Sequence, residues 1–268
     1  MEGALSGYRA LDLADEKGTF CSRLLADMGA EVIRIENPGS DSASSRFPWE
    51  TNLGKLDITL NIETSPGRKI FQRLVKTADV VVESYPPGYL ATLGLGYSAL
   101  SELNPQLIMA SITNFGQSGP YRDYKSDDIV ASAMGGQMHV CGEPQMPPLK
   151  PFGNQSFYSA GLFGAIGILL ALWHRHTVGR GQYIDISVEE CVAATLDHVL
   201  TRYFYQGVVA TRQGNLYWNN AFRIFPCRDG YILLSLLQQY PTLVELLDAE
   251  GMAEDLTDKK WRAREEGL

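Results

Sequence analysis

The sequence predicts an α/β fold: a Rossmann-like, doubly wound and mostly parallel sheet in a large domain, followed by the start of a small second domain. The first observation is that apolar strand-like and helix-like stretches alternate along the chain, which is typical of parallel sheets covered by helices. The second is the apolar run Ala160–Trp173. At about 14 residues it is shorter than a bilayer span, so we expect a core helix.

The first three elements set the fold class. Tyr8–Leu13 is predicted to be a strand, Phe20–Met28 an amphipathic helix and Glu31–Glu36 a second strand, so the three form a parallel βαβ unit. The turn between strand and helix, Ala14–Phe20, reads ADEKGTF and lacks the GxGxxG pattern. We therefore expect neither a nicotinamide nor a flavin nucleotide here.

The alternation continues and ends in a polar loop. After the predicted strand Leu107–Ile112, a glycine-rich loop carries Lys125, Asp127 and Asp128. Ligands of open α/β sheets collect at the carboxyl ends of strands, so this loop is a candidate site. A solvated loop with a local ion pair is the alternative. The other elements expected here are helices at Lys69–Lys76, Tyr97–Leu103 and Ile129–Met134 and a strand at Asp79–Ser84.

The long apolar helix and the residues after it define the expected domains. Its glycines recur every three residues, which predicts a face for close backbone packing. The expected domains are residues 1–187, a connecting segment at 188–213 and an incomplete small domain at 214–268. The glycines are Gly161, Gly164 and Gly167. Further along the chain we expect one core helix at Val188–Tyr205, a strand at Asp229–Leu237 and a charged helix at Lys259–Leu268.

Composition excludes several classes of protein. A formal net charge of −8 over 268 residues disfavours a general nucleic-acid binder, because phosphate binding needs a basic face. The four cysteines are far apart and form no CxxC, so we expect neither a metal site nor a disulfide framework. No signal-peptide pattern opens the chain, so a cytoplasmic protein without a membrane partner is expected.

Four segments of the chain are informative in their order and spacing: Leu24–Asp41, Ala78–Ile108, Ser111–Tyr121 and His176–Ser187. Together they resemble the family III CoA-transferases, the group of formyl-CoA transferase, carnitine CoA-transferase and the bile-acid-inducible transferases. The resemblance implies a transferase that moves coenzyme A between an acyl-CoA and a carboxylic acid. It also implies a homodimer, or a heterodimer with a paralogous subunit, in which the two subunits interlock. Family members are longer, so we expect a C-terminally shortened chain or a fragment.

The same resemblance implies residues that bind coenzyme A. Lys125 matches a lysine that contacts a CoA phosphate, and Leu60 matches an apolar residue beside the adenine. Ser84 and Tyr85 stand where asparagine and phenylalanine are usual at the CoA pocket. Asn37 and Thr92 stand where arginines are frequent, so two phosphate contacts are weakened or lost.

The family nucleophile is expected to be absent. Family transferases use an aspartate whose carboxylate attacks the acyl-CoA thioester to give a mixed anhydride and then an enzyme-bound thioester. It lies about four residues before the first glycine of the long helix, and here that position is Phe157. The racemase branch is disfavoured too, because Asp127 and Phe157 occupy the positions of its two bases.

Three hypotheses remain open from the sequence. The first is an enzyme with an unusual catalytic group, for which Asp127, Asp128, Glu16 and Tyr158 are the candidates. The second is a non-catalytic CoA-binding subunit that pairs with a catalytic paralogue. The third is an inactive, truncated scaffold. The acyl group and the acid acceptor are not revealed by the sequence.

Overall fold

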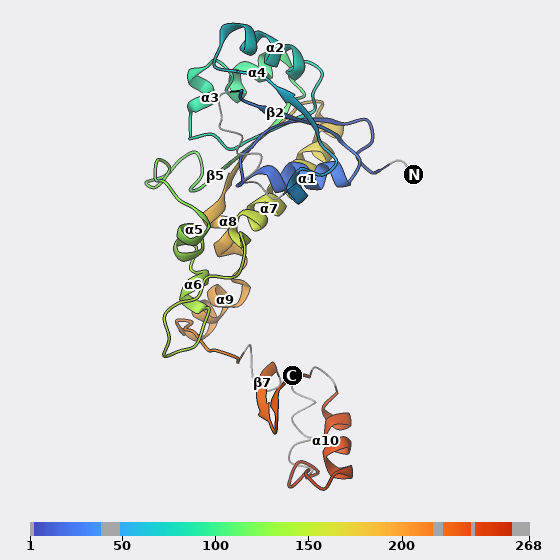
Figure 1. Cartoon of the computed structure of the whole chain (residues 1–268), viewed down its shortest axis with the longest axis vertical. Coiled ribbons are helices and arrows are strands. Elements are labelled where there is room, and N and C mark those ends of the chain that lie inside the picture. Colours follow the sequence, from blue (N-terminus) through green and yellow to red (C-terminus); the bar gives the residue numbers. More distant parts are fainter. Residues whose placement is uncertain (1–2, 39–48, 217–221, 237–238, 259–268) are drawn as a thin grey trace. The chain divides into compact units, whose positions relative to one another are not determined.

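The computed structural model describes residues 3–38, 49–216, 222–236 and 239–258. The chain forms two compact units (Figure 1). The first comprises residues 1–141 and 148–210, and the second comprises residues 142–147 and 211–268. Residues 188–210 thus belong to the first unit.

The first unit is built on a six-stranded sheet in which all strand pairs are parallel. The strand order is β3-β2-β1-β4-β5-β6. The direction of winding therefore reverses between β1 and β4, as in a doubly wound fold, which confirms the predicted fold class. The strands are β1 (Arg9–Leu13), β2 (Glu31–Glu36), β3 (Leu56–Thr59), β4 (Val80–Glu83), β5 (Ile108–Thr113) and β6 (Tyr183–Ser187).

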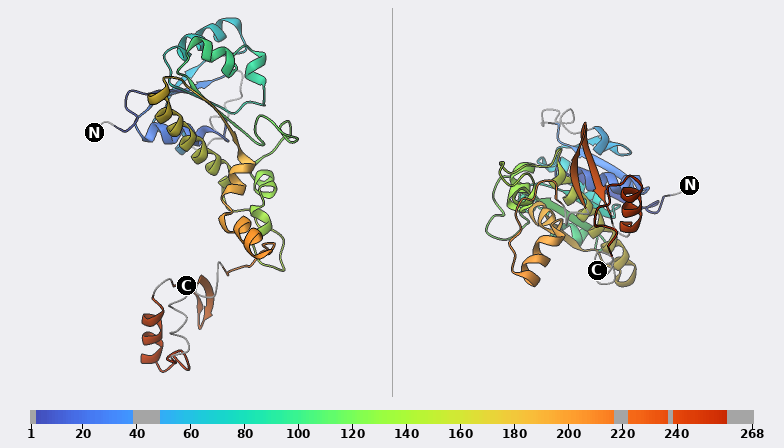
Figure 2. Two further views of the ribbon diagram at one scale, coloured as in Figure 1. Left: turned by 180° about the vertical axis from the view of Figure 1, so that it is seen from behind. Right: turned by 90° about the horizontal axis from the view of Figure 1, so that it is seen from below.

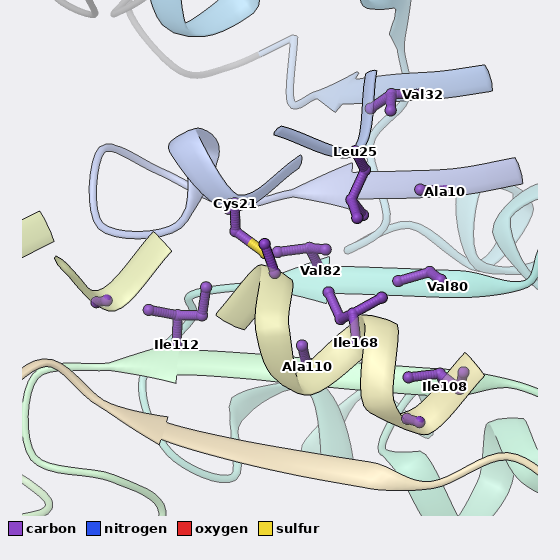
Figure 3. Packing of buried hydrophobic residues seen from close by; sticks show 14 of the residues in the cluster. Ala10, Cys21, Leu25, Val32, Val80, Val82, Ile108, Ala110, Ile112 and Ile168 are labelled. Carbon is purple, nitrogen blue, oxygen red and sulfur yellow. The ribbon is translucent and has the colours of Figure 1, made fainter. Parts of the chain in front are cut away.

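Helices cover both faces of this sheet, because successive strand residues point to opposite sides. On one face, Val82 and Ala110 pack with Ile168 of the long helix α7 (Figure 3). On the other face, Val81 and Met109 belong to a second core cluster. The helices of the first face are α1 (Thr19–Asp27) and α7 (Gln155–Val178); those of the second are α2 (Ser65–Val75), α3 (Tyr89–Thr92) and α4 (Tyr97–Leu103).

Helix α7 is longer than the sequence predicted. It has 24 residues and begins at Gln155, so by length and composition alone it could cross a membrane. Half of its most apolar 18-residue window is buried in this structure. A Cβ atom on Gly161 would lie 3.0 Å from the backbone nitrogen of Cys21, and one on Gly164 would lie 3.1 Å from Cys21 Sγ. The predicted close packing is confirmed at Gly161 and Gly164, whose neighbour is α1 (Figure 2), whereas Gly167 faces Ile184 of β6.

The prediction of a single core helix over Val188–Tyr205 is wrong. The chain forms α8 (Val188–Ala194) and then α9 (Asp197–Gln206), and no residue of α9 is buried. The Thr195 hydroxyl donates to the carbonyl oxygen of Val192 at 2.7 Å at the end of α8, and such local bonds favour helix termination. The remaining helices of this unit are a 3₁₀ turn at Trp49–Asn52, α5 (Asp128–Met134) and α6 (Gln137–Val140).

The second unit contains more structure than was predicted. Strand β8 (Gly230–Ser235) lies within the expected segment, and it pairs in antiparallel fashion with β7 (Phe222–Cys227), which was missed. Helix α10 (Tyr240–Ala249) was also missed. The helix expected at Lys259–Leu268 lies outside the described residues.

Candidate functional site

A pocket of about 510 Å³ opens where β1, β4 and β5 end. It lies at the point where the winding of the sheet reverses, which is the usual ligand site of open α/β sheets. Three loops form it, one after each strand. Its lining residues are Leu13, Asp15, Lys17, Ser84, Tyr85, Pro86, Pro87, Thr113, Asn114, Arg122, Asp123, Tyr124, Lys125 and Ser126.

Lys125 supplies the pocket with a cation that is available to a ligand. Its neighbours are already paired, since Lys17 bonds to Asp15 and Arg122 to Asp123. Among the residues that the structure describes, no ion pair or hydrogen bond engages the Lys125 ammonium group. An unpaired ammonium group at a pocket wall favours binding of phosphate or carboxylate.

The predicted residues Ser84 and Tyr85 form one wall of this pocket, and two carboxylates hold them. Ser84 Oγ accepts from the backbone N–H of Asp15 and donates to Asp15 Oδ1, both at 2.7 Å. The backbone N–H of Tyr85 donates to Glu83 Oε2 at 2.8 Å. Burial, Tyr89 and the Glu83 carboxylate raise the pKa of Tyr85 to about 12, so its phenol is neutral at physiological pH.

Glu83 is a buried residue behind this wall, and it was not predicted from the sequence. The pKa of its carboxyl is raised from 4.5 to about 7, mainly by burial. Hydrogen bonds from Ser111 and Tyr85 lower this pKa, and the nearby charges of Asp15 and Asp185 raise it. Its position at the end of the buried run VVVE was the available signal. Its hydrogen-bond partners were not apparent because Ser111 lies on the neighbouring strand.

Two further polar atoms of the lining residues are buried without a partner. No described residue forms a hydrogen bond with Thr113 Oγ1 or with Asn114 Oδ1. Buried polar groups are almost always bonded, and unsatisfied ones concentrate where ligands or water bind. Their position at the end of β5 supports a polar ligand in the pocket.

Leu60 and Asn37 lie outside this pocket lining. Leu60 follows β3 and packs against the second core cluster, and its N–H donates to the Glu36 carbonyl at 2.8 Å. Asn37 follows β2. Both residues nevertheless lie at the carboxyl edge of the same sheet, because β1, β2 and β3 are parallel neighbours.

Phe157 lies in the first turn of α7 and is part of the core. Its side chain is 3% exposed and belongs to the apolar cluster between the sheet, α1 and α7. Tyr158, the next residue, is half-buried, and its ring meets the ring of Phe20 edge-on with centroids 5.0 Å apart. Neither side chain lines the pocket.

The two aspartates near this turn have structural partners. Asp127 caps α5 by accepting from the N–H of Val130 at 3.2 Å. Asp128 is buried, forms an ion pair with Lys150, and accepts from the N–H of Ser156 at 2.9 Å. Asp128 therefore ties α5 to the N-terminus of α7.

Glu16 has a different environment from these two aspartates. Partial burial raises the pKa of its carboxyl, the charges of Asp15, Asp127 and Asp128 raise it further, and Lys17 lowers it. In the described ranges, Glu16 has no recorded ion pair or side-chain hydrogen bond. It is thus the carboxylate of this region that retains both exposure and a perturbed pKa.

Comparison with known proteins identifies the family. The family model for CoA-transferase family III matches residues 5–267, nearly the whole chain. The chain belongs to CoA-transferase family III. It is 38% identical over 241 residues to the succinyl-CoA–L-malate CoA-transferase beta subunit of Chloroflexus aurantiacus, covering 85% of this chain. It is 35% identical over 272 residues to the succinate–glutarate CoA-transferase of Agrobacterium fabrum, covering 94% of this chain.

The structural comparison agrees with this family. A CAIB/BAIF family protein from Brucella suis superposes with a TM-score of 0.84 and 31% sequence identity, covering 97% of this chain and 73% of that one. The chain spans 58% of the length of the Chloroflexus relative and 68% of the Agrobacterium relative. The chain thus corresponds to only part of the length of these two relatives.

Proposed function

We propose that this chain binds the coenzyme A part of an acyl-CoA thioester in the pocket at the ends of β1, β4 and β5. The observation that carries the proposal is that Ser84, Tyr85 and Lys125 line this one pocket although they come from two different loops. The free ammonium group of Lys125 suits a CoA phosphate. The relatives named above are CoA-transferases, which supports a thioester of coenzyme A as the ligand.

We further propose that the chain takes part in moving CoA between an acyl-CoA and a carboxylic acid as a CoA-binding subunit. The transfer needs a carboxylate that can carry the acyl group. Phe157 occupies the position inferred for it, and Asp127 and Asp128 are held in structural contacts. A paralogous subunit would supply the carboxylate. The relative in Chloroflexus is itself named a subunit, which supports this division of labour.

A second candidate function is an enzyme that uses Glu16. This carboxylate lies close enough to Asp127 and Asp128 for their charges to raise its pKa, and partial burial raises it further. In such a reaction, a Glu16 oxygen would attack the thioester carbonyl carbon. The C–S bond would break, the CoA thiolate would leave, and a mixed anhydride would remain on Glu16.

Helix α7 supports the proposal of a second subunit. Four large apolar side chains spaced by three or four residues are exposed on it, as on one face of a helix. Large exposed apolar patches mark association surfaces. These side chains are Leu162, Ile166, Leu170 and Trp173, with exposed fractions of 48%, 52%, 64% and 78%.

Calorimetry with coenzyme A tests the proposed binding site. Lys125→Ala is expected to weaken CoA binding about tenfold to a hundredfold, because it removes a charge-assisted bond to phosphate. Lys69→Ala is the matched control: it removes an exposed lysine from α2 and is expected to leave binding unchanged. Equal affinity of both variants for coenzyme A would refute the proposed site.

Activity measurements separate the two candidate functions. The purified chain alone is expected to be inactive with an acyl-CoA and a carboxylic acid, and activity should appear on co-expression with a paralogue that carries the aspartate. Full activity of the chain alone, lost in Glu16→Gln, would instead establish the second candidate.

A further inference from the structure

The turn that carries Ser84 and Tyr85 is held from behind by a buried acid. Glu83 is the last residue of β4 and is 4% exposed. One of its carboxylate oxygens accepts the backbone N–H of Tyr85 at 2.8 Å. The backbone of a pocket residue is therefore fixed by the side chain of its second neighbour along the chain.

A chain of hydrogen bonds extends from this carboxylate across the sheet. The Ser111 hydroxyl on β5 donates to Glu83, and Ser111 Oγ accepts from the Tyr183 hydroxyl on β6 at 2.9 Å. The ring of Tyr183 stacks on that of Tyr97, with centroids 5.4 Å apart. The carboxylate thus links three neighbouring strands, β4, β5 and β6, behind the pocket wall.

Within the described residues, Glu83 has no cation to balance its charge. In the part of the chain that the structure describes, no lysine or arginine forms an ion pair with it. The charged and titratable groups that face it are Asp15 from the loop after β1, Asp185 and Tyr183 from β6, and Tyr85 from its own turn. A buried carboxylate among other acids lowers stability, and such groups are concentrated at functional sites.

We propose that Glu83 is a positioning residue of the coenzyme A pocket: its carboxylate holds the Ser84–Tyr85 turn in the binding conformation, and protonation of Glu83 weakens ligand binding. This inference rests on the proposed binding of coenzyme A in that pocket. It concerns a residue behind the wall and not one that touches the ligand, because Glu83 is absent from the pocket lining.

The chemistry of the carboxyl group gives the direction of the effect. A carboxylate only accepts hydrogen bonds, so it can receive both the Tyr85 N–H and the Ser111 hydroxyl. A protonated carboxyl carries a donor on one oxygen and keeps only neutral acceptors. Its bonds with the Tyr85 N–H and the Ser111 hydroxyl are then no longer charge-assisted and are about half as strong. The charged form therefore fixes the turn more firmly.

The decisive test compares the pH dependence of CoA binding in the wild type and in Glu83→Gln. From pH 8 to pH 6, the dissociation constant of the wild type is expected to rise about threefold to tenfold more than that of the variant, which matches the loss of one hydrogen bond. Glutamine keeps the oxygen that accepts from Tyr85 but does not titrate. The CoA phosphate titrates near pH 6 in both experiments, so the ratio of the two dissociation constants removes its effect.

Glu189→Gln is the matched control. The pKa of Glu189 is also raised by burial, but this residue lies on α8 and does not line the pocket. The control is expected to show the pH dependence of the wild type. The same pH dependence in Glu83→Gln as in the wild type would overturn the proposal.

Hydrogen exchange tests Glu83 without any ligand. After correction for the intrinsic effect of pH on exchange, the amide of Tyr85 in the wild type is expected to lose protection between pH 8 and pH 6. In Glu83→Gln its protection should stay constant, and equal behaviour of the two proteins would refute the role of Glu83. A wild type that loses protection as expected but binds no CoA at any pH would instead refute the proposed function.

Discussion

The pocket and the N-terminus of α7 differ in how they use their polar groups. In the pocket, Lys125 is unpaired within the described ranges, and Thr113 carries a buried hydroxyl without a partner there. At the N-terminus of α7, Asp128 is bound to Lys150 and to the N–H of Ser156, and Phe157 is packed in the core. The first region has polar groups left for a ligand. The second has used its groups for packing and connection, which supports the proposed separation of CoA binding from acyl transfer.

The largest effect is expected from Phe157→Ala. Removing a buried phenylalanine ring lowers the free energy of unfolding by about 3–5 kcal/mol, because the side chain is 3% exposed. Denaturant unfolding measures the loss. Phe163→Ala on the same helix is the control: that ring is 39% exposed, so it should cost about 1 kcal/mol.

The contrast between the pocket and the N-terminus of α7 also predicts how the folded Phe157→Ala protein binds coenzyme A. Its dissociation constant for coenzyme A should remain within about twofold of the wild type, since Phe157 is not part of the pocket lining. A large loss of affinity in calorimetry at a temperature where the variant is folded would show that the two regions are coupled.

The next effect concerns stability as a function of pH. Burial raises the pKa of Glu83 from 4.5 to about 7 in the folded protein, so the folded state holds its proton more tightly than the unfolded state. The resulting stabilisation is complete below the unfolded pKa and is lost as pH rises through the folded pKa. Between pH 4.5 and pH 8, the free energy of unfolding of the wild type should fall relative to Glu83→Gln by up to about 3 kcal/mol.

Urea unfolding of both proteins at several pH values measures this difference. Other titrating groups contribute equally to wild type and variant, so they cancel. A difference that does not change with pH would mean that Glu83 titrates at its ordinary pKa.

The smallest effect on stability is expected at Asp127, where two variants distinguish a capping role from a catalytic one. Asp127→Ala removes the cap of α5 and should lower the free energy of unfolding by about 1 kcal/mol. Asp127→Asn should be close to the wild type, because asparagine caps as well as aspartate. Thermal unfolding distinguishes them. If Asp127→Asn keeps its stability but abolishes transfer in the complex with a paralogue, Asp127 has a chemical role as well.

Much of the fold could be predicted because strands buried on both faces are apolar throughout. Strands β4 and β5 were recognised from such runs, and all their residues are buried. Strand β3 was not identified as an element, since none of its residues is buried and it carries the polar residues Asp57 and Thr59. The break between α8 and α9 falls at Thr195 and Leu196, and apolar periodicity does not reveal it.

The site was predictable where the family resemblance assigned a role to a residue. Lys125, Ser84 and Tyr85 were singled out in this way, and all three line the pocket. Asp128 and Glu16 looked equivalent in the sequence. They differ in the structure because Lys150, 22 residues away along the chain, neutralises Asp128. This ion pair could not be inferred from the sequence.

Mass spectrometry of the purified chain incubated with acyl-CoA tests the separation of binding and transfer most directly. At a concentration of acyl-CoA shown by calorimetry to saturate the pocket, hydroxylamine or borohydride is added to trap any acylated carboxylate. The separation predicts that the wild-type chain binds the acyl-CoA and keeps its unmodified mass. A trapped adduct, above all one on Glu16, would contradict it.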